Sequence, residues 1–330
     1  MENKNDKIDF VILWVDGNDE EWLKEKNKYL KVKGDSSLNR FRDCKNLQYL
    51  FRGIEKHAPW VNKVFFITWG HLPKWLDVNN PKLEIVKHED FIPNEYLPTF
   101  NYNVIEMNLF RIKNLSSKFV IFNDDLFILK DLKQEDFFEK GLPKDMYIEY
   151  MKKNCSRRYS VLRKSHGNII NKYFHKRDVL KYNKGKMFNL KYGMSNFQTL
   201  KMLKYKDFQD IYSQHLTQCY LKETFEEIWE KEYEKLHIAC NNKFRADNDL
   251  GCTLCRYWQL LSGKFMPTAK IGEYFFIKND NTKLLKTIQK KSKKIICIND
   301  ADININFEKS IDEINKSLEA VFPDKCSFEY

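Results

Sequence analysis

Two adjacent carboxylates, Asp124 and Asp125, stand between two short apolar runs in KFVIFNDDLFI, residues 118–128. In a partly buried setting these charges repel each other unless a cation neutralises them. Oxygen ligands suit Mg²⁺ or Mn²⁺, and such an ion would also bridge a diphosphate. The other interpretation is a solvent-exposed turn, because Asn-Asp-Asp is good turn chemistry. The apolar residues on both sides favour the metal site.

Other polar residues could act on a phosphorylated ligand. Asp16 and Gly17 follow the first apolar run and could hold a ribose or base, although a hairpin turn is equally consistent. His215 could serve as a base near neutral pH, or be an ordinary structural histidine. Arginine binds phosphate oxygens in a planar, bidentate way, with surface salt bridges as the alternative. The arginines that stand near acids and aromatics are Arg40, Arg42, Arg111 and Arg245.

Strands alternate with helices along the chain, which predicts an α/β fold with a mainly parallel sheet. Strands are expected at residues 8–15, 63–69, 83–87, 118–128 and 294–298. Helices are expected at residues 19–33, 43–57, 103–115, 221–236, 249–261 and 307–322. Ligands of such sheets bind at the carboxyl ends of the strands, where Asp16-Gly17 and Asp124-Asp125 both fall.

The chain divides into three segments by its pattern. Residues 1–140 and 214–330 are expected to form the two parts of one catalytic α/β core. Residues 141–213 are rich in Lys, Asn and Tyr and read as a basic, mostly helical insertion. Its cations suggest that it guides an anionic polymer; they include Arg157, Arg158, Lys176 and Arg177.

Composition limits the class of protein. With 330 residues, 42% hydrophobic and 15% aromatic, the chain can bury a core, and disorder is excluded. No apolar run approaches the roughly 18–20 residues that span a bilayer, and the polar start does not resemble a signal peptide. A cytoplasmic protein is therefore expected, with peripheral contact to the inner face of a membrane or to a capsule-assembly complex.

The net charge of +11 suggests anionic partners, although lysines scattered by a coding bias would give the same number. A nucleic-acid-binding protein is the rival without catalysis, but no motif of that kind occurs, so nucleic acid is not expected as a partner. The eight cysteines are expected to be reduced thiols. Cys252 and Cys255 form a CxxC that we interpret as a buried helical face, because no second pair completes a zinc site.

Several long strings resemble the four conserved regions of the Stealth family, in order. The first region corresponds to FVILWVDGNDEEW (residues 10–22). The second corresponds to residues 39–76 and 97–128, the third to residues 215–249 and 256–267, and the fourth to KIICINDAD (residues 294–302). Stealth proteins are hexose-1-phosphoryl transferases of microbial capsule synthesis, related to the catalytic subunits of the animal N-acetylglucosamine-1-phosphotransferase.

The resemblance implies a nucleotide-sugar transferase-like core and attack by a polysaccharide hydroxyl on the β-phosphorus of a UDP-sugar, with release of UMP. It implies the catalytic residues Glu106, Asp125, His215 and Arg245, with His215 as base and Arg245 on the phosphate. It places Asp16, Gly17, Arg40, Arg42 and Asn123 at the nucleotide-sugar, where the arginine pattern adds Arg111. Mg²⁺ or Mn²⁺ would be held by Asp124, Asp125, Asn299 and Asp300. The alternative is a conventional metal-dependent glycosyltransferase, which would release UDP.

Overall fold

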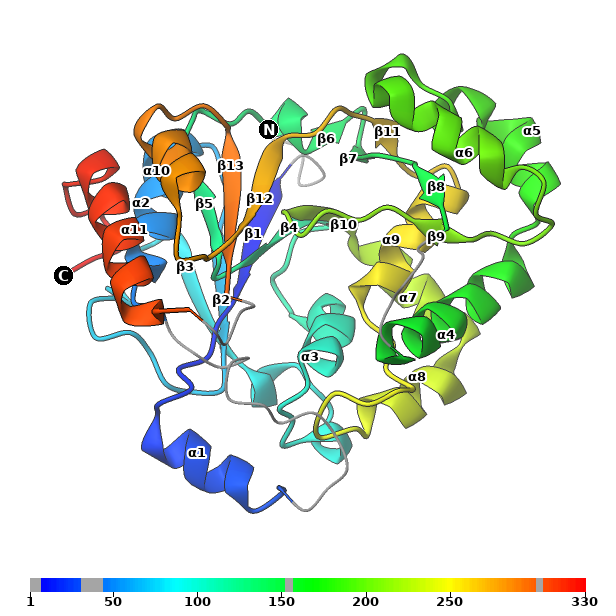
Figure 1. Cartoon of the computed structure of the whole chain (residues 1–330). Helices are drawn as coiled ribbons and strands as arrows, with labels where there is room; N and C mark the ends of the chain where they lie inside the picture. The colour runs from blue at the N-terminus through cyan, green and yellow to red at the C-terminus, as the bar shows by residue number, and fades with distance from the viewer. Residues whose placement is uncertain (1–6, 31–43, 152–156, 301–304) are drawn as a thin grey trace, which may run out of the picture.

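The computed structural model describes residues 7–30, 44–151, 157–300 and 305–330. Its centre is a five-stranded sheet in the order β10-β4-β1-β2-β3 (Figure 1). The strands are β1 (Ile8–Leu13), β2 (Val64–Thr68), β3 (Leu83–Lys87), β4 (Lys118–Asn123) and β10 (Gln218–Leu221). All but β10 run parallel, which confirms the α/β fold with a mainly parallel sheet.

A second sheet joins the middle of the chain to its C-terminal part. Its order is β12-β13-β5, formed by β5 (Leu126–Ile128), β12 (Gly272–Phe276) and β13 (Ile295–Asn299). Only Asp124 and Asp125 separate β4 of the first sheet from β5 of the second. The acid pair therefore lies at the junction of the two sheets, and β13 is brought next to it by pairing with β5.

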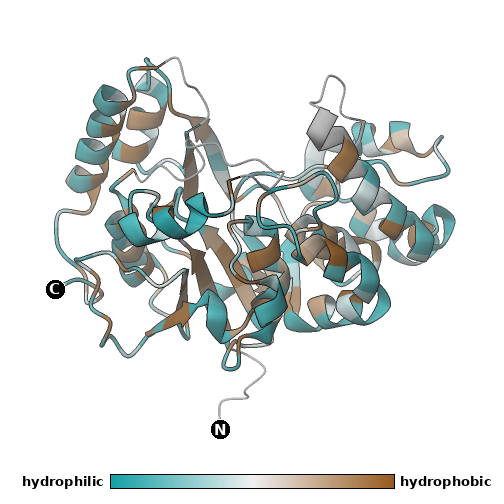
Figure 2. Ribbon diagram, turned by 90° about the horizontal axis from the view of Figure 1, so that it is seen from below, coloured by the Kyte–Doolittle hydropathy of each residue, from teal (hydrophilic) through white to brown (hydrophobic). Residues whose placement is uncertain are grey.

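Alternate residues of the central strands enter two separate cores. Phe10 and Ile12 of β1 pack into one, and Val11 and Leu13 into the other. The first core is covered by α2 (Leu47–His57), α10 (Thr282–Gln289) and α11 (Phe307–Val321). The second is covered by α3 (Tyr102–Asn108), α7 (Lys222–Lys231), α8 (Tyr233–Cys240) and α9 (Cys252–Leu261). Hydrophobic strands therefore lie inside, between helices whose outer sides are hydrophilic (Figure 2).

The remaining elements lie mostly beside the central sheet (Figure 1). The helices are α1 (Glu20–Asn27), α4 (Arg157–Tyr173), α5 (Lys176–Met187) and α6 (Asn196–Met202). Short strands are β6 (Phe138–Glu139), β7 (Leu142–Asp145), β8 (Glu149–Tyr150), β9 (Asp210–Ile211) and β11 (Met266–Pro267). The 3₁₀ helices are η3 (His88–Asp90), η4 (Asn94–Tyr96), η5 (Leu109–Arg111), η6 (Gln134–Asp136) and η7 (Leu190–Ser195). Within the described part of the chain, no helix is long and apolar enough to cross a membrane.

Three predicted helices are shorter than expected. The helix predicted over residues 19–33 ends at Asn27 and is followed by a turn at residues 28–30. The helix predicted over residues 221–236 is two helices, because Glu232 leaves helical geometry with φ −128° and ψ 33°. Its buried carboxylate binds Lys172 at 2.5 Å and Lys235 at 2.7 Å, which joins this break to α4. The helix predicted over 103–115 ends at Asn108 and continues as η5. The strands β10 and β12 were not predicted from the sequence.

The cysteine interpretation is confirmed where the structure describes these residues. Cys252 and Cys255 are buried on α9, and Cys240 is buried on α8. None of the cysteines in the described segments forms a disulfide.

Candidate active site

Asp125 is the centre of a polar cluster at the junction of the two sheets. Its carbonyl oxygen accepts a hydrogen bond from the Ile298 backbone at 2.8 Å, which ties the turn to β13. Three side chains reach its Oδ2: Asn299 Nδ2 at 3.1 Å, Cys297 Sγ at 3.2 Å and His215 Nε2 at 3.2 Å. Residues that are far apart in the sequence therefore converge on one carboxylate.

His215 reaches this cluster because β10 runs antiparallel to β4. Gln218 pairs with Ile121, so the residues just before β10 lie at the carboxyl end of β4. The imidazole keeps 49% of its surface exposed, and its edge meets the Tyr274 ring. The hydrogen bond to Asp125 raises the pKa of His215, and this outweighs the opposing effect of burial. A half-exposed imidazole held by a carboxylate is a common arrangement for a general base.

A chain of hydrogen bonds links His215 to a second buried acid on α3. Asn123 Nδ2 lies 3.4 Å from His215 Nε2, and its Oδ1 accepts from the Tyr102 hydroxyl at 2.7 Å. One helical turn after Tyr102, Glu106 accepts a hydrogen bond from the Cys252 backbone at 3.2 Å. Burial raises the pKa of Glu106, although hydrogen bonds from Tyr102 and Cys252 oppose the shift.

Arg245 lies on the other side of Tyr102. Its guanidinium carbon is 5.6 Å from the centre of the Tyr102 ring, and its charge opposes the rise in the pKa of Glu106. The loop that carries Arg245 is fixed by Asp249, which accepts hydrogen bonds from Asn101 at 2.9 Å and from the Ala246 backbone at 2.9 Å. The structure thus brings together the four residues predicted as catalytic, Glu106, Asp125, His215 and Arg245.

The residues predicted to hold the nucleotide-sugar are spread more widely. Asp16 and Gly17 form a turn just after β1, where the Asp16 backbone donates to His71 Nε2 at 2.8 Å. Arg111 lies over the rings of Phe110 and Trp229 and donates to Asn108 at 2.9 Å. Arg40 and Arg42 lie outside the described residues.

The metal residues predicted from the sequence partly coincide with a group found in the structure. Ligand atoms of Asp125, His215 and Cys297 all lie within 4.8 Å of one another. Asp125 Oδ1 is buried and has no hydrogen-bond partner among the described residues, so this oxygen suits a cation. In the metal-free protein, burial and the neighbouring Asp125 raise the pKa of Cys297. A thiol is a soft ligand, which Mg²⁺ and Mn²⁺ do not favour. Mg²⁺ and Mn²⁺ prefer oxygen ligands, which the Asp125 carboxylate supplies in this group.

Two members of the cluster were missed by the sequence reasoning. Tyr102 lies four residues before Glu106, a spacing that puts both on one face of a helix. Cys297 lies two residues before Asn299, which puts both on one face of a strand. Each spacing points to its residue only after α3 and β13 are known to carry site residues.

One prediction about the insertion is wrong. Lys176 is buried and binds Glu149 at 2.8 Å, so it cannot guide a polymer at the surface. A buried charge of this kind needs its partner. The side chains of Arg157 and Arg158 lie outside what the structure describes.

Comparison with known proteins identifies the family. Models of Stealth protein conserved region 1 and conserved region 2 match residues 6–31 and 40–145. The chain is 46% identical over 326 residues to the capsular polysaccharide phosphotransferase WcwK of Streptococcus pneumoniae, covering 98% of both chains. The chain belongs to the Stealth family. Like the named members of the Stealth family, it is a transferase enzyme.

Two further relatives of this Stealth protein come from other bacteria. The receptor polysaccharide phosphotransferase WefC of Streptococcus gordonii is 36% identical over 341 residues, covering 98% of this chain and 99% of the relative. The exopolysaccharide phosphotransferase cps2G of Lactiplantibacillus plantarum is 33% identical over 325 residues, covering 98% and 96%.

Proposed function

We propose that this Stealth protein transfers a hexose-1-phosphate, with N-acetylhexosamine as the first candidate sugar, from a UDP-sugar to a hydroxyl of a capsular or cell-surface polysaccharide. The acceptor oxygen bonds to the β-phosphorus, and the bond from that phosphorus to the bridging oxygen breaks. UMP leaves with the bridging oxygen, and a phosphodiester remains. The observation that carries the proposal is the half-exposed His215 held against Asp125 at the end of the central sheet. The names of the three relatives above, all polysaccharide phosphotransferases, also support it.

The residues around this pair can be given roles. His215 takes the acceptor proton, and Asp125 stabilises the imidazolium that forms, in keeping with the raised pKa of His215. Arg245 neutralises charge on the transferred phosphoryl group. Glu106, beside Tyr102, is the second acid of the site. Asp16 and Gly17 contact the nucleotide after β1, with Arg40, Arg42, Asn123 and Arg111 as further binding candidates.

Mg²⁺ or Mn²⁺ is the proposed cofactor. Asp124 and Asp125 would hold it together with Asn299 and Asp300, and it would neutralise the diphosphate. This assignment leaves His215 free to accept a proton, which it could not do as a metal ligand.

The experiment screens UDP-N-acetylglucosamine and three other UDP-hexoses with Mg²⁺, Mn²⁺ or EDTA, using oligosaccharides of the producing strain's polysaccharide as acceptors. We expect metal-dependent UMP release and a phosphodiester signal in the ³¹P NMR spectrum of the product. His215→Gln should abolish both. UDP release with a phosphorus-free glycosidic product would instead establish conventional glycosyl transfer.

We also propose that the enzyme works at an anionic membrane surface. Large apolar side chains are exposed on η7 and α6, where Leu190 is 98% exposed and Met194 79%. Residues 177–206 around them hold eight lysines or arginines and one aspartate. An exposed apolar patch ringed by lysines fits the boundary between acyl chains and anionic headgroups. Figure 1 shows α5 and α6 at an outer corner of the molecule, free to face a surface.

Cosedimentation with vesicles tests the membrane proposal. The protein should bind phosphatidylglycerol vesicles but not phosphatidylcholine vesicles, and Leu190→Asp with Met194→Asp should weaken binding. Ile238→Asp is the matched control, since Ile238 is an exposed apolar residue on α8, outside the patch. Equal binding by the double variant and the parent would refute the proposal.

A further inference from the structure

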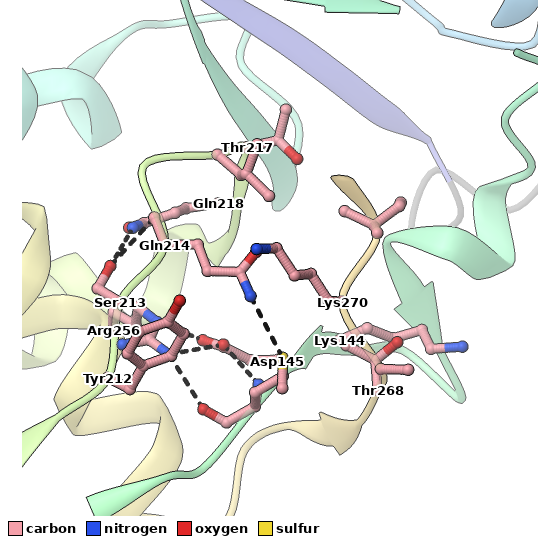
Figure 3. Close-up of a pocket in the computed structure, with 14 residues that line it drawn as sticks. Lys144, Asp145, Tyr212, Ser213, Gln214, Thr217, Gln218, Arg256, Thr268 and Lys270 are labelled. Carbon is pink, nitrogen blue, oxygen red and sulfur yellow. Dashed lines mark hydrogen bonds and ion pairs between the residues drawn. The ribbon is translucent and has the colours of Figure 1, made fainter. Parts of the chain in front are cut away.

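A pocket lies beside the proposed base and has no role in the account above. The segment that carries His215 forms one of its walls, through Gln214, Leu216 and Thr217. Residues next to β7 and β11 form the opposite wall, and Arg256 of α9 closes it from below (Figure 3). The space between these walls, about 450 Å³, is open to solvent. It is therefore a depression that a sugar of a polymer can enter from solvent, next to the segment that carries the proposed base.

Arg256 lines this pocket, and one nitrogen of its guanidinium is left without a partner among the described residues. The residue is only 4% exposed, and its Nε and Nη2 donate to the two carboxylate oxygens of Asp145 at 2.7 and 2.8 Å. Nη2 also donates to the Met146 carbonyl at 3.1 Å. The remaining nitrogen, Nη1, is buried and has no partner among the residues that the structure describes. Buried donors are nearly always satisfied, so an acceptor atom from a ligand is the natural partner of Nη1.

The rest of the lining offers hydrogen bonds and positive charge. Gln214, Gln218 and Thr268 contribute amide and hydroxyl groups, and Lys270 adds an exposed cation at the rim. Figure 3 shows the Gln214 side chain extending toward Lys270 across the pocket. The lining also includes apolar groups such as Leu216 and Ile271, so it offers both hydrogen bonds and apolar contact to a sugar ring.

We propose that this pocket is the subsite for the sugar of the polysaccharide that carries the attacking hydroxyl, with Arg256 Nη1 donating to an oxygen of that sugar. The inference rests on the proposed function, in which His215 is the base. A base must lie within hydrogen-bond reach of the proton it removes, so the acceptor sugar has to bind beside His215. Gln214 and Leu216, the sequence neighbours of His215, line the pocket, whereas the His215 ring contacts Asp125 and Tyr274. A sugar in the pocket would therefore extend its attacking hydroxyl past this segment to the base. The donor would then bind at the Asp16 turn and at Arg245, which lie on other elements.

Binding is measured by calorimetry, without donor, using oligosaccharides of one to three repeat units from the producing strain's own polysaccharide. Arg256→Lys removes the guanidinium fork but keeps the charge opposite Asp145. We expect it to weaken oligosaccharide binding about tenfold or more, as for loss of a charged hydrogen-bond donor. Lys270→Ala, at an exposed position, should weaken oligosaccharide binding several-fold. This variant tests the proposal even if Arg256→Lys fails to fold. Lys316→Ala, an exposed lysine on α11, is the control and should bind like the parent.

UDP and UMP binding serves as the second readout, and it should be unchanged in all three variants. Unchanged oligosaccharide affinity in folded Arg256→Lys and in Lys270→Ala would overturn the proposal, as would weaker nucleotide binding. A parent that binds no oligosaccharide at all would also overturn it. Because binding is measured without turnover, a failure of the proposed reaction shows separately, as the wrong product or none in the donor screen.

Discussion

At the scale of single residues, His215 is defined by its contact with Asp125. The hydrogen bond raises the pKa of His215, whereas burial alone would lower it. In metal-free protein, Asp125→Asn should therefore move the pKa of His215 below the ordinary value of about 6.5. The pair stabilises the fold at low pH, and this contribution is lost as the pH rises through the pKa of His215.

NMR titration of the histidine ring protons in EDTA checks this prediction. His88 is the internal control, because burial lowers its pKa to about 3, so it should stay neutral from pH 5 to 9 in both proteins. An unchanged His215 titration in Asp125→Asn would contradict the arrangement at the sheet junction.

Tyr102 is predicted to position the base without touching substrate. Tyr102→Phe removes the hydroxyl that holds Asn123 Oδ1 at 2.7 Å and leaves the ring below Arg245. Loss of one neutral hydrogen bond is worth about 1 kcal/mol, so kcat should fall about fivefold with little change in donor KM. Tyr96→Phe is the control, since the Tyr96 hydroxyl contacts His237. Equal kcat values in Tyr102→Phe and Tyr96→Phe would contradict a positioning role for Tyr102.

The sequence indicated the acids and the base but not their connections. Asp125 was found because an acid pair between apolar runs is unusual. Glu106 came from the family resemblance alone, which also favoured His215 and Arg245 among the candidates already noted. Tyr102 and Cys297 carried no signal of their own. Their contacts depend on how α3 and β13 pack, which is set by long-range pairing rather than by local pattern.

At the scale of elements, the junction of the sheets depends on close packing of α2 against β5. A Cβ on Gly53 would lie 2.8 Å from the Ile128 carbonyl oxygen, which is a backbone atom and cannot move away easily. Gly53→Ala should therefore lower the free energy of unfolding by about 1–3 kcal/mol. In Gly185→Ala, the added Cβ of α5 meets nothing within 4 Å, so stability should stay equal or rise by up to about 1 kcal/mol. Urea unfolding measures both, and equal stabilities would contradict this packing.

The elements with clear periodicity were predictable, and the short pairing strands were not. β1, β2 and β4 are buried apolar runs, and α2 and α11 have regular apolar faces. β10 is four residues long and lies between a loop and α7, so its strand character comes from pairing with β4. That pairing is what brings His215 to Asp125. The strand pairing that assembles the site was thus the feature least predictable from the sequence.

At the scale of the whole molecule, the C-terminal segment closes the fold against α2. Arg52 donates to Glu329 at 2.7 and 2.8 Å and to the Phe322 carbonyl at 2.6 Å. Glu329 has only 3% of its side chain exposed, so Arg52→Met would leave a buried carboxylate without its partner. The free energy of unfolding at pH 7 should fall by about 3–5 kcal/mol.

The pH dependence of that loss has a definite sign. Burial would raise the pKa of Glu329, but the hydrogen bonds and charge of Arg52, together with hydrogen bonds from Cys326, outweigh burial and lower the pKa. The Glu329 contribution is therefore present above the unfolded pKa of about 4.3 and disappears as the pH falls through the folded value. The difference between parent and Arg52→Met in urea unfolding should shrink below pH 4. A constant difference from pH 7 to pH 3 would contradict the pairing.

The division into a two-part core, 1–140 and 214–330, around an insertion at 141–213 remains a proposal. Strand β10 completes the central sheet and β13 completes the second one, so both parts contribute strands to shared sheets. Residues 141–213 carry α4, α5 and α6, and they also supply Asp145 to the Arg256 pocket. If the acceptor subsite is correct, the insertion helps to select the polysaccharide.

The central claim is that the bond formed by this enzyme is to phosphorus. The direct measurement uses a UDP-sugar labelled with ³²P at the β-phosphate, incubated with acceptor oligosaccharide, Mg²⁺ and either the parent or Asp125→Asn. We expect the parent to transfer the label to the oligosaccharide and to release unlabelled UMP. We expect Asp125→Asn to transfer no label. Label that stays in released UDP while sugar enters the oligosaccharide would contradict the claim and place the attack at the anomeric carbon.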